Sequence, residues 1–382
     1  MHIRHLVSIF LFLFISSLSG SLLAPENGAK INYIHVLFEW EQHPEASSYT
    51  LYISSDKQFY NLIQVNLDAL IHIEEDAIDW DSDYFWKVVY NSSDGTELSV
   101  SDTYQFSTAS SISDLEIISY IPDQYSDGVT ILGSYLGHNT IVFDKDGDKI
   151  WNDNGMGIVY YNTAYYGQLF GCQHNAELEY VLPAVEFNLN SEILWIDPND
   201  EFAHHDIIQL PNGNYMSIVN EIELGPIPGE LLASTNVSFY NFLCILSGYS
   251  CDGYTNEYDW IGDKVVEWDA ETKEVVWEWS VHDYFSKVDY DEGLWSSIQI
   301  GDAYDWTHLN ALAYSEDDNA VYISARHLSR ITKINYTTKE IIWSMGLDMP
   351  SGDIGCGQDI NFSWQHGIQL TPGGGIVFLD NG

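Results

Sequence analysis

The feature that most restricts the possible folds is a hairpin pattern that recurs in the second half of the chain. Each of these hairpins begins at a histidine. His205 begins an apolar strand and stands six residues before Pro211, in a Pro-Asn-Gly-Asn turn that leads into a second strand. His366 stands six residues before Pro372, which begins a glycine-rich turn. This spacing also selects His205 over its neighbour His204. Turn residues between strand-forming runs predict β-hairpins, so both histidines open a hairpin at a matching position.

A third hairpin is predicted within residues 305–327, where two apolar runs flank a polar turn centred near Asp317. Antiparallel pairing about that turn places residues whose numbers sum to about 634 opposite each other. His308 and Arg326 satisfy this sum. An imidazole that can titrate or attack therefore meets a permanently charged guanidinium at the open end of one hairpin.

Hairpins of a second kind alternate with the histidine hairpins, and each of them ends near a tryptophan. The four examples span residues 140–151, 185–195, 264–277 and 331–343. Such alternation, with helical periodicity nearly absent, is typical of an all-β propeller, in which matching positions converge on the central axis. At about 45 residues per blade, residues 115–382 provide about six blades, with a long loop expected at 224–261. The sequence stops directly after a strand, which leaves closure of the ring open.

A smaller all-β module is predicted ahead of the propeller, in residues 24–108. Its short alternating strands are separated by clusters of Asp, Ser, Gly and Pro. Their spacing, with Trp40 as a candidate buried tryptophan, is typical of a β-sandwich and resembles a fibronectin type III domain. Spacing, docking and a homodimer contact are the roles open to this module, because nothing catalytic stands out in it.

Residues 1–23 have the organisation of a secretory signal peptide. A charged start precedes an apolar run from Leu6 to Ile15, and small residues follow from Ser16 to Ser21. The apolar run is short for a membrane span, although a membrane anchor is the alternative. We therefore expect an exported protein, secreted or periplasmic, without membrane contact once the signal is removed.

The composition argues against several classes of partner. Thirteen Lys and Arg oppose 57 Asp and Glu, for a formal charge of −44, which disfavours nucleic acids and anionic membranes. An aromatic content of 14% indicates a packed protein rather than a disordered one. The four cysteines form no Cys-x-x-Cys motif, although a local disulfide between Cys244 and Cys251 is plausible; the pairing of Cys172 and Cys356 stays open.

Several motifs, taken in order, give the chain a resemblance to the bacterial, cofactor-independent arylsulfate sulfotransferases. They are His-His-Asp-Ile with Leu-Pro-Asn-Gly-Asn at 204–214, Val-Val-Glu-Trp-Asp with Val-Val-Trp-Glu-Trp at 265–279, Asp-Trp-Thr-His at 305–308, Ser-Ala-Arg-His at 324–327, and Gln-His-Gly with Leu-Asp-Asn-Gly at 365–382. Each motif is weak alone, but their order and spacing are specific. The resemblance covers the signal, the fibronectin-like module and the propeller, which is nearly the whole chain. Relatives continue past the last strand, so the resemblance also implies a member truncated at its C-terminus.

The resemblance implies a six-bladed propeller with an axial site of histidines and an arginine. It implies an aryl sulfate donor, a phenolic acceptor, and neither a cofactor nor a metal. One histidine of the family is transiently sulfated, and the Gln-His motif identifies this nucleophile as His366. His205, His308 and Arg326 match the supporting catalytic residues.

The chemistry of sulfuryl transfer agrees with these residue types. A neutral imidazole is a competent nucleophile near pH 7, and covalent capture divides the reaction into two easier steps. Arg326 offers forked donors to the charged sulfuryl oxygens. His205 and His308 can donate to the same oxygens or protonate the leaving phenolate, and we favour His308 for the second role. Trp306 and Trp364 are the candidates for holding the aryl ring.

Two other functions fit the same residues. A propeller polysaccharide lyase also uses His and Arg against an anionic substrate, and a non-enzymatic propeller would hold an anion, zinc or copper with its histidines. His327 is expected to face the other side of its strand from Arg326 and to be structural. His174 is a candidate fourth axial residue. Residues 144–148 resemble a calcium loop but lack its terminal Glu, so a hairpin turn is predicted there.

Overall fold

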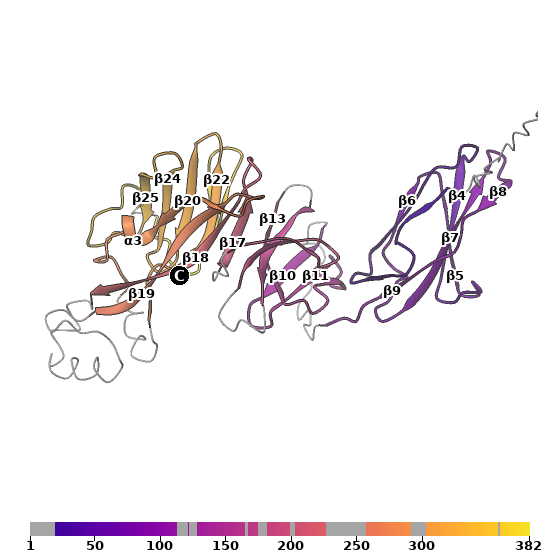
Figure 1. Ribbon diagram of the computed structural model, residues 1–382, viewed down its shortest axis with the longest axis horizontal. Helices are drawn as coiled ribbons and strands as arrows, with labels where there is room; N and C mark the ends of the chain where they lie inside the picture. Colours follow the sequence, from indigo (N-terminus) through magenta and orange to yellow (C-terminus); the bar gives the residue numbers. More distant parts are fainter. Residues whose placement is uncertain are drawn as a thin grey trace, which may run out of the picture. The chain divides into compact units, whose positions relative to one another are not determined.

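The computed structural model describes residues 20–112, 121, 128–164, 167–174, 182–198, 203–226, 257–291, 303–357 and 360–382. These residues form β-strands and one short helix, α3 (Val281–Tyr284), which confirms the predicted all-β class (Figure 1). No helix within these ranges is long and apolar enough to cross a membrane. The chain divides into two compact units, one of residues 1–130 with 142–154 and the other of residues 131–141 with 155–382.

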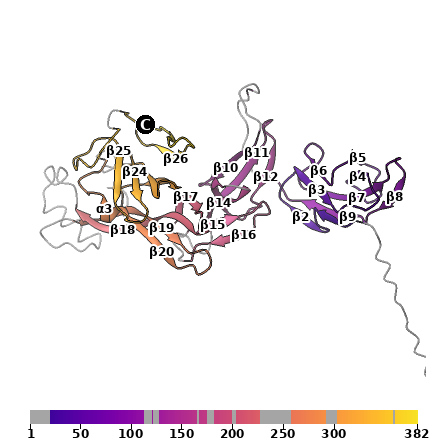
Figure 2. The same cartoon turned by 90° about the horizontal axis from the view of Figure 1, so that it is seen from above.

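The first unit contains a β-sandwich (Figure 2). One sheet has the strand order β1 (Leu22–Ala24), β3 (Val36–Trp40), β6 (Ile71–Glu74). The other has the order β2 (Ala29–Ile31), β9 (Tyr104–Thr108), β7 (Asp83–Asn91), β4 (Ser48–Ser54), β5 (Leu62–Leu67), and β8 (Glu97–Val100) pairs with its β7. Phe38 from one sheet packs edge-on against Trp86 and Phe106 from the other. The buried position predicted for Trp40 is confirmed, since only 1% of its surface is exposed.

The sandwich begins inside the segment predicted as a signal peptide. Residues 1–19 lie outside the described residues, but Leu22 is buried and pairs with Trp40. The hydroxyl of Tyr90 also donates to the carbonyl oxygen of Gly20 at 2.9 Å. A boundary after residue 23 would therefore fall within β1.

Beyond the sandwich, the chain forms successive antiparallel sheets in which each strand pairs with the next one along the sequence (Figure 1). They comprise β10 (Thr130–Ser134), β11 (Asn139–Phe143), β12 (Lys149–Asn152); β13 (Ile158–Thr163), β14 (Leu169–Gln173), β15 (Ala184–Phe187), β16 (Ile193–Ile196); β17 (Ala203–Gln209), β18 (Tyr215–Pro226), β19 (Glu257–Trp268), β20 (Val275–Ser280); β22 (Leu309–Ser315), β23 (Ala320–Ala325), β24 (Arg330–Asn335), β25 (Ile341–Gly346); and β26 (His366–Leu370), β27 (Ile376–Leu379). In addition, β21 (Tyr304–Asp305) pairs in parallel with β19.

All seven predicted hairpins are present in these sheets. The histidine hairpins are β17–β18, β22–β23 and β26–β27, and the hairpins of the second kind are β11–β12, β15–β16, β19–β20 and β24–β25. The long loop predicted at 224–261 is wrong at both ends. Residues 224–226 and 257–261 extend one ladder, in which Leu224 pairs with Asp259 and Ile222 with Ile261. Residues 227–256, which include Cys244 and Cys251, lie outside the described residues.

Two smaller predictions can also be compared with the structure. Asp144 closes a hairpin turn, because its Oδ1 accepts the backbone N–H groups of Asp146 and Asp148, each at 2.9 Å, as predicted for this acidic segment. Cys172 and Cys356 are both free thiols, and Cys172 is buried.

The first strands of neighbouring sheets contact one another in sequence order. β13 contacts β17, β17 contacts β22, and β22 contacts β26. Large side chains fill the space between the β17–β20 and β22–β25 sheets, including the fully buried Trp260, Trp279 and Trp306. No sheet closes on itself within the residues that the structure describes. The successive sheets agree with propeller blades, but the ring itself stays a prediction.

Candidate functional site

The candidate histidines lie at irregular starts of their strands. The pairing register shifts near the beginning of β17, β22 and β26. His205 and His308 have φ angles of 64° and 48°, and Gly367, which follows His366, has a φ of 63°. Non-glycine residues rarely adopt this left-handed conformation, so the strand alternation is broken at each site. Bulges of this kind redirect side chains, and each of the three candidate histidines lies at or next to such an irregularity.

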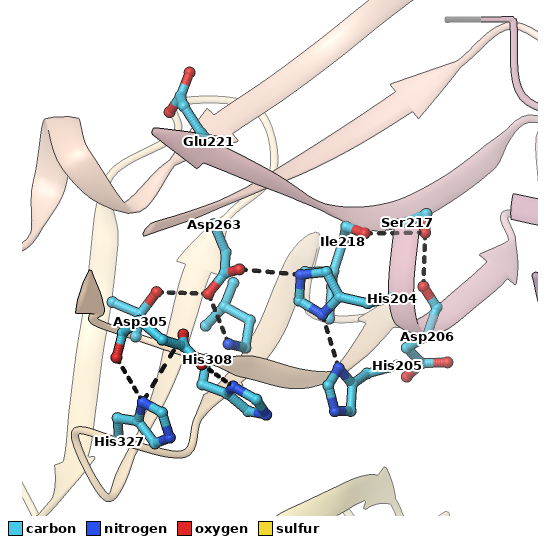
Figure 3. Close-up of polar contacts among 12 residues, drawn as sticks. His204, His205, Asp206, Ser217, Ile218, Glu221, Asp263, Asp305, His308 and His327 are labelled. Carbon is cyan, nitrogen blue, oxygen red and sulfur yellow. Dashed lines mark hydrogen bonds and ion pairs between the residues drawn. The ribbon is translucent and has the colours of Figure 1, made fainter. Parts of the chain in front are cut away.

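The redirected side chains of His205 and His308 meet on one side of the sheets (Figure 3). Their ring centres lie 4.9 Å apart, with an angle of 69° between the planes. Leu309 pairs with Ala325, and the backbone N–H of Arg326 donates to the carbonyl oxygen of His308 at 3.2 Å. The predicted pairing of His308 with Arg326 is therefore confirmed.

Arg326 lies over the indole ring of Trp364. Its guanidinium carbon is 4.1 Å from the ring centroid, which is a cation–π contact. The indole N–H of Trp364 donates to Asp291 Oδ2 at 3.4 Å, and its backbone has a φ of 51°. Trp364 is thus at the site, but it supports the arginine with one face of its ring.

His366 has a defined tautomer. Its Nδ1 lies 2.9 Å from the carbonyl oxygen of Trp364, and a carbonyl oxygen only accepts hydrogen bonds. The proton of the neutral ring must therefore be on Nδ1, which leaves the lone pair on Nε2. An unprotonated Nε2 is what a nucleophilic imidazole requires.

The four residues predicted as catalytic influence one another electrostatically. Burial, followed by the neighbouring imidazoles of His204, His308 and His366, lowers the pKa of His205 to about 3. Burial also lowers the pKa of His366, with Arg326 and His308 contributing in the same direction. The cationic form is disfavoured at both rings, so His205 and His366 are neutral near pH 7.

His204, which the sequence spacing set aside, lies behind His205. Its Nδ1 is 2.7 Å from Nδ1 of His205, and its Nε2 is 3.1 Å from Oδ1 of Asp263. Oδ2 of Asp263 accepts from the Thr307 hydroxyl at 2.5 Å and from the Leu309 backbone at 2.7 Å. Burial opposes ionisation of Asp263, but these donors outweigh it and its pKa is lowered. The buried carboxylate of Asp263 therefore orients His204, which in turn contacts His205.

His327 also joins the cluster, contrary to the prediction that it faces away. Its ring stacks on His308 with centroids 4.6 Å apart, and its Nδ1 lies 2.7 Å from the carbonyl oxygen of Asp305. Strand alternation does not apply to it, because β23 ends at Ala325 and a turn follows. Asp305 Oδ2 lies 2.6 Å from Nδ1 of His308. Ligand atoms of Asp305, His308 and His327 all lie within 4.8 Å of one another, as a metal site would need.

A cavity of about 480 Å³ opens beside the histidines. His204, His205, Asp305 and His308 form part of its lining, together with aromatic and aliphatic side chains, namely Tyr135, Val159, Tyr160, Tyr161 and Ile261. A mostly apolar wall next to a few polar groups is typical of a site for a small aromatic molecule.

The predicted role of Trp306 in substrate binding is wrong. Its side chain is fully buried in the core, and its indole N–H donates to the carbonyl oxygen of Asp289 at 2.7 Å. Its neighbour in the sequence, Thr307, is also buried, so this segment packs inward on both sides of its backbone. His174 stacks on His138 with ring centroids 3.8 Å apart.

Comparison with protein families connects this geometry to a reaction class. Residues 239–382 match the model of the arylsulfotransferase (ASST) family. The match supports membership in the arylsulfotransferase family. The arylsulfotransferase segment contains His308, Arg326 and His366, whereas His205 precedes it. Membership supports sulfotransferase activity in general.

Comparisons with whole proteins add only distant similarities. No curated protein matches the chain in sequence. Similar solved structures include an Fn3-like protein from Clostridium thermocellum, at 15% identity over 23% of this chain and 92% of that one, with a TM-score of 0.19. A human fibronectin type III domain is 18% identical over 28% of this chain and 83% of that one, with a TM-score of 0.20. The dihydro-heme d1 dehydrogenase NirN is 12% identical over 94% of this chain and 61% of that one, with a TM-score of 0.31.

Several residues of the candidate site were not identified from the sequence. Asp305 had a visible signal, because it stands three residues before His308. Asp263 had a weaker one, as an acidic residue inside a strongly apolar strand. His204 and the tyrosines of the cavity had none, because a left-handed residue and contacts between sheets bring them to the site.

Proposed function

We propose that the chain is an arylsulfate sulfotransferase that moves a sulfuryl group from an aryl sulfate ester to a phenolic acceptor through a sulfohistidine on His366. The observation that carries this proposal is the bond between Nδ1 of His366 and the Trp364 carbonyl oxygen, which leaves Nε2 as a nucleophile beside Arg326. The family of the segment that contains both residues supports the same class of substrates.

In the first half-reaction, the lone pair of His366 Nε2 attacks sulfur. The new N–S bond forms as the bond between sulfur and the aryl oxygen breaks, and the phenolate takes the bonding pair. The sulfated ring carries a positive charge, which the Trp364 carbonyl stabilises through the N–H at Nδ1. Arg326 balances the charge shared by the sulfuryl oxygens, and the cavity with Tyr160 and Tyr161 holds the aryl ring.

In the second half-reaction, an acceptor phenol loses its proton to a base and attacks the same sulfur. The N–S bond breaks and neutral His366 is restored, so the two substrates react in turn. His205 and His308 are the candidates for the group that protonates the leaving oxygen and later deprotonates the acceptor.

The remaining features of the chain fit an exported enzyme. We propose that the chain begins with a signal peptide, that a fibronectin-like module follows it and ends near residue 108, and that residues 115–382 form the propeller. A homodimer through the sandwich stays part of this proposal. Secretion or periplasmic location would place the site among small-molecule phenols and their sulfate esters.

One observation favours a second function, metal binding. Asp305, His308 and His327 present three ligand atoms within 4.8 Å of one another, from residue types that zinc binds. Calorimetric titration with Zn²⁺, for the wild type and for Asp305→Asn, measures this binding directly. If a chelator abolishes sulfuryl transfer and Zn²⁺ restores it, the result favours a metal-dependent enzyme over a cofactor-independent one.

A transfer assay tests the main proposal. With 4-nitrophenyl sulfate as donor, release of 4-nitrophenolate should accelerate when phenol is added, and phenyl sulfate should appear in equal amount. Hydrolysis without phenyl sulfate would point to a sulfatase, and no turnover would contradict the proposal.

A further inference from the structure

The pair of adjacent histidines on β17 has an arrangement that a regular strand does not allow. Neighbouring side chains normally point to opposite faces, but the φ of 64° at His205 places both rings together. The rings are nearly perpendicular, with centroids 5.0 Å apart and the two Nδ1 atoms 2.7 Å apart. At that distance one nitrogen donates and the other accepts, so a single proton lies between the rings.

We propose that Asp263, His204 and His205 form a proton relay to the reacting phenolic oxygen, an inference that rests on the proposed sulfotransferase function. Both nitrogens of His204 are engaged, one by a buried carboxylate and the other by an imidazole that borders the cavity. A histidine that only anchored Asp263 would not need the second contact.

The relay balances as follows during donor cleavage. His204 starts as an imidazolium, with Nε2–H bonded to Asp263 and Nδ1–H bonded to Nδ1 of His205. Nε2–H of His205 passes its proton to the phenolate as Nδ1 of His205 takes the proton from His204. Both rings end neutral, and the positive charge of His204 has neutralised the phenolate. The acceptor phenol reverses these transfers in the second half-reaction.

Asp263 is suited to hold the charge of His204. Its side chain is about 2% exposed and accepts three hydrogen bonds, from His204, Thr307 and Leu309. His308 has a carboxylate partner too, but Asp305 is 43% exposed, where water weakens the interaction. The more enclosed carboxylate, Asp263, is therefore linked through His204 to His205. This link makes His205 better placed than His308 for proton transfer.

The test compares two donors in a first-turnover experiment without acceptor. Phenyl sulfate releases a phenol of pKa about 10, similar to tyrosine, and needs a proton, whereas 4-nitrophenolate is a much weaker base. In His204→Gln, the amide can still donate to Asp263 and accept from His205, but it cannot carry a proton. Phenol release from phenyl sulfate should fall about 100-fold or more, and release from 4-nitrophenyl sulfate less than about tenfold.

Asp263→Asn should give the same selective loss, because a neutral amide does not stabilise an imidazolium. His72→Gln, on the sandwich, is the matched control and should match the wild type with both donors. Equal losses with both donors, or none, would overturn the relay, since a structural histidine does not distinguish leaving groups. A wild-type chain that is sulfated by neither donor would instead overturn the proposed function.

Discussion

The guanidinium carbon of Arg326 lies 4.1 Å from the centre of the Trp364 ring, and the backbone carbonyl of the same tryptophan orients His366. One residue thereby positions both the cation and the proposed nucleophile. Since Trp364 has a positive φ, its backbone and side chain point in directions that a regular strand would not give them. The site therefore depends on the local backbone as much as on the reacting side chains.

Two arginines four residues apart should separate catalysis from folding. Arg326→Met should reduce kcat/KM for transfer by about 100-fold or more, because the charged sulfuryl oxygens lose their cation. Its cost in unfolding free energy should stay below about 1 kcal/mol, the size of a partly exposed cation–π contact. Transfer kinetics and chemical denaturation measure the two effects.

Arg330 provides the matched comparison. Its side chain is fully buried and lies 2.5 Å from Asp289, which is buried as well. Arg330→Met leaves that carboxylate without its cation and should destabilise the protein by about 3–5 kcal/mol. An active Arg326→Met variant, or an Arg330→Met variant of unchanged stability, would contradict these assignments.

The tyrosines of the cavity should determine affinity for the aryl ring. Tyr160→Ala should raise the KM for 4-nitrophenyl sulfate about tenfold, since losing an aromatic contact costs about 1.4 kcal/mol. Trp306→Phe should leave that KM unchanged and lower stability by about 1–3 kcal/mol, because it removes a buried hydrogen bond to Asp289. The reverse pattern would restore Trp306 as the substrate-binding residue and exclude the cavity.

The histidine cluster should make stability depend on pH in a defined direction. The pKa of His205 is about 3 in the folded protein against an ordinary 6.5, so the unfolded chain binds its proton more readily between these values. Stability from this residue is complete above pH 6.5 and is lost as the pH falls towards 3. Between pH 7 and pH 5 the loss should be roughly 2 kcal/mol.

Urea unfolding of the wild type and of His205→Gln at both pH values isolates this contribution. The groups that act on His205 are His204, His308, His366 and Asp305, and all of them stay in place in the variant. Equal pH dependence of the two proteins would show that His205 is not held neutral by its surroundings.

The hairpins could be predicted because local residues determine them. Pro211 and Asp317 lie in turns whose types follow from their own sequences, and the register of His308 with Arg326 follows from the turn position. Trp306 was misplaced for a different reason. A residue between two functional side chains can face either way, and only the packing of two sheets shows that this one lies in the core.

The second layer of the site could not be predicted from spacing. His204 was set aside because the spacing before Pro211 selected its neighbour His205, and a regular strand turns neighbouring side chains to opposite faces. His327 was set aside because this alternation separates it from Arg326. A left-handed residue in the first case and the end of a strand in the second remove that alternation. Asp263 is far from His204 in sequence and meets it through the sheet of β17, β18 and β19.

The intact mass of the protein after brief mixing with 4-nitrophenyl sulfate, without acceptor, tests the central claim most directly. A sulfohistidine adds ~80 mass units, one sulfuryl group, to the wild type. The gain should disappear when phenol is added and should be absent in His366→Asn. Transfer that proceeds with no gain in mass, or an adduct that persists in His366→Asn, would contradict covalent catalysis by His366.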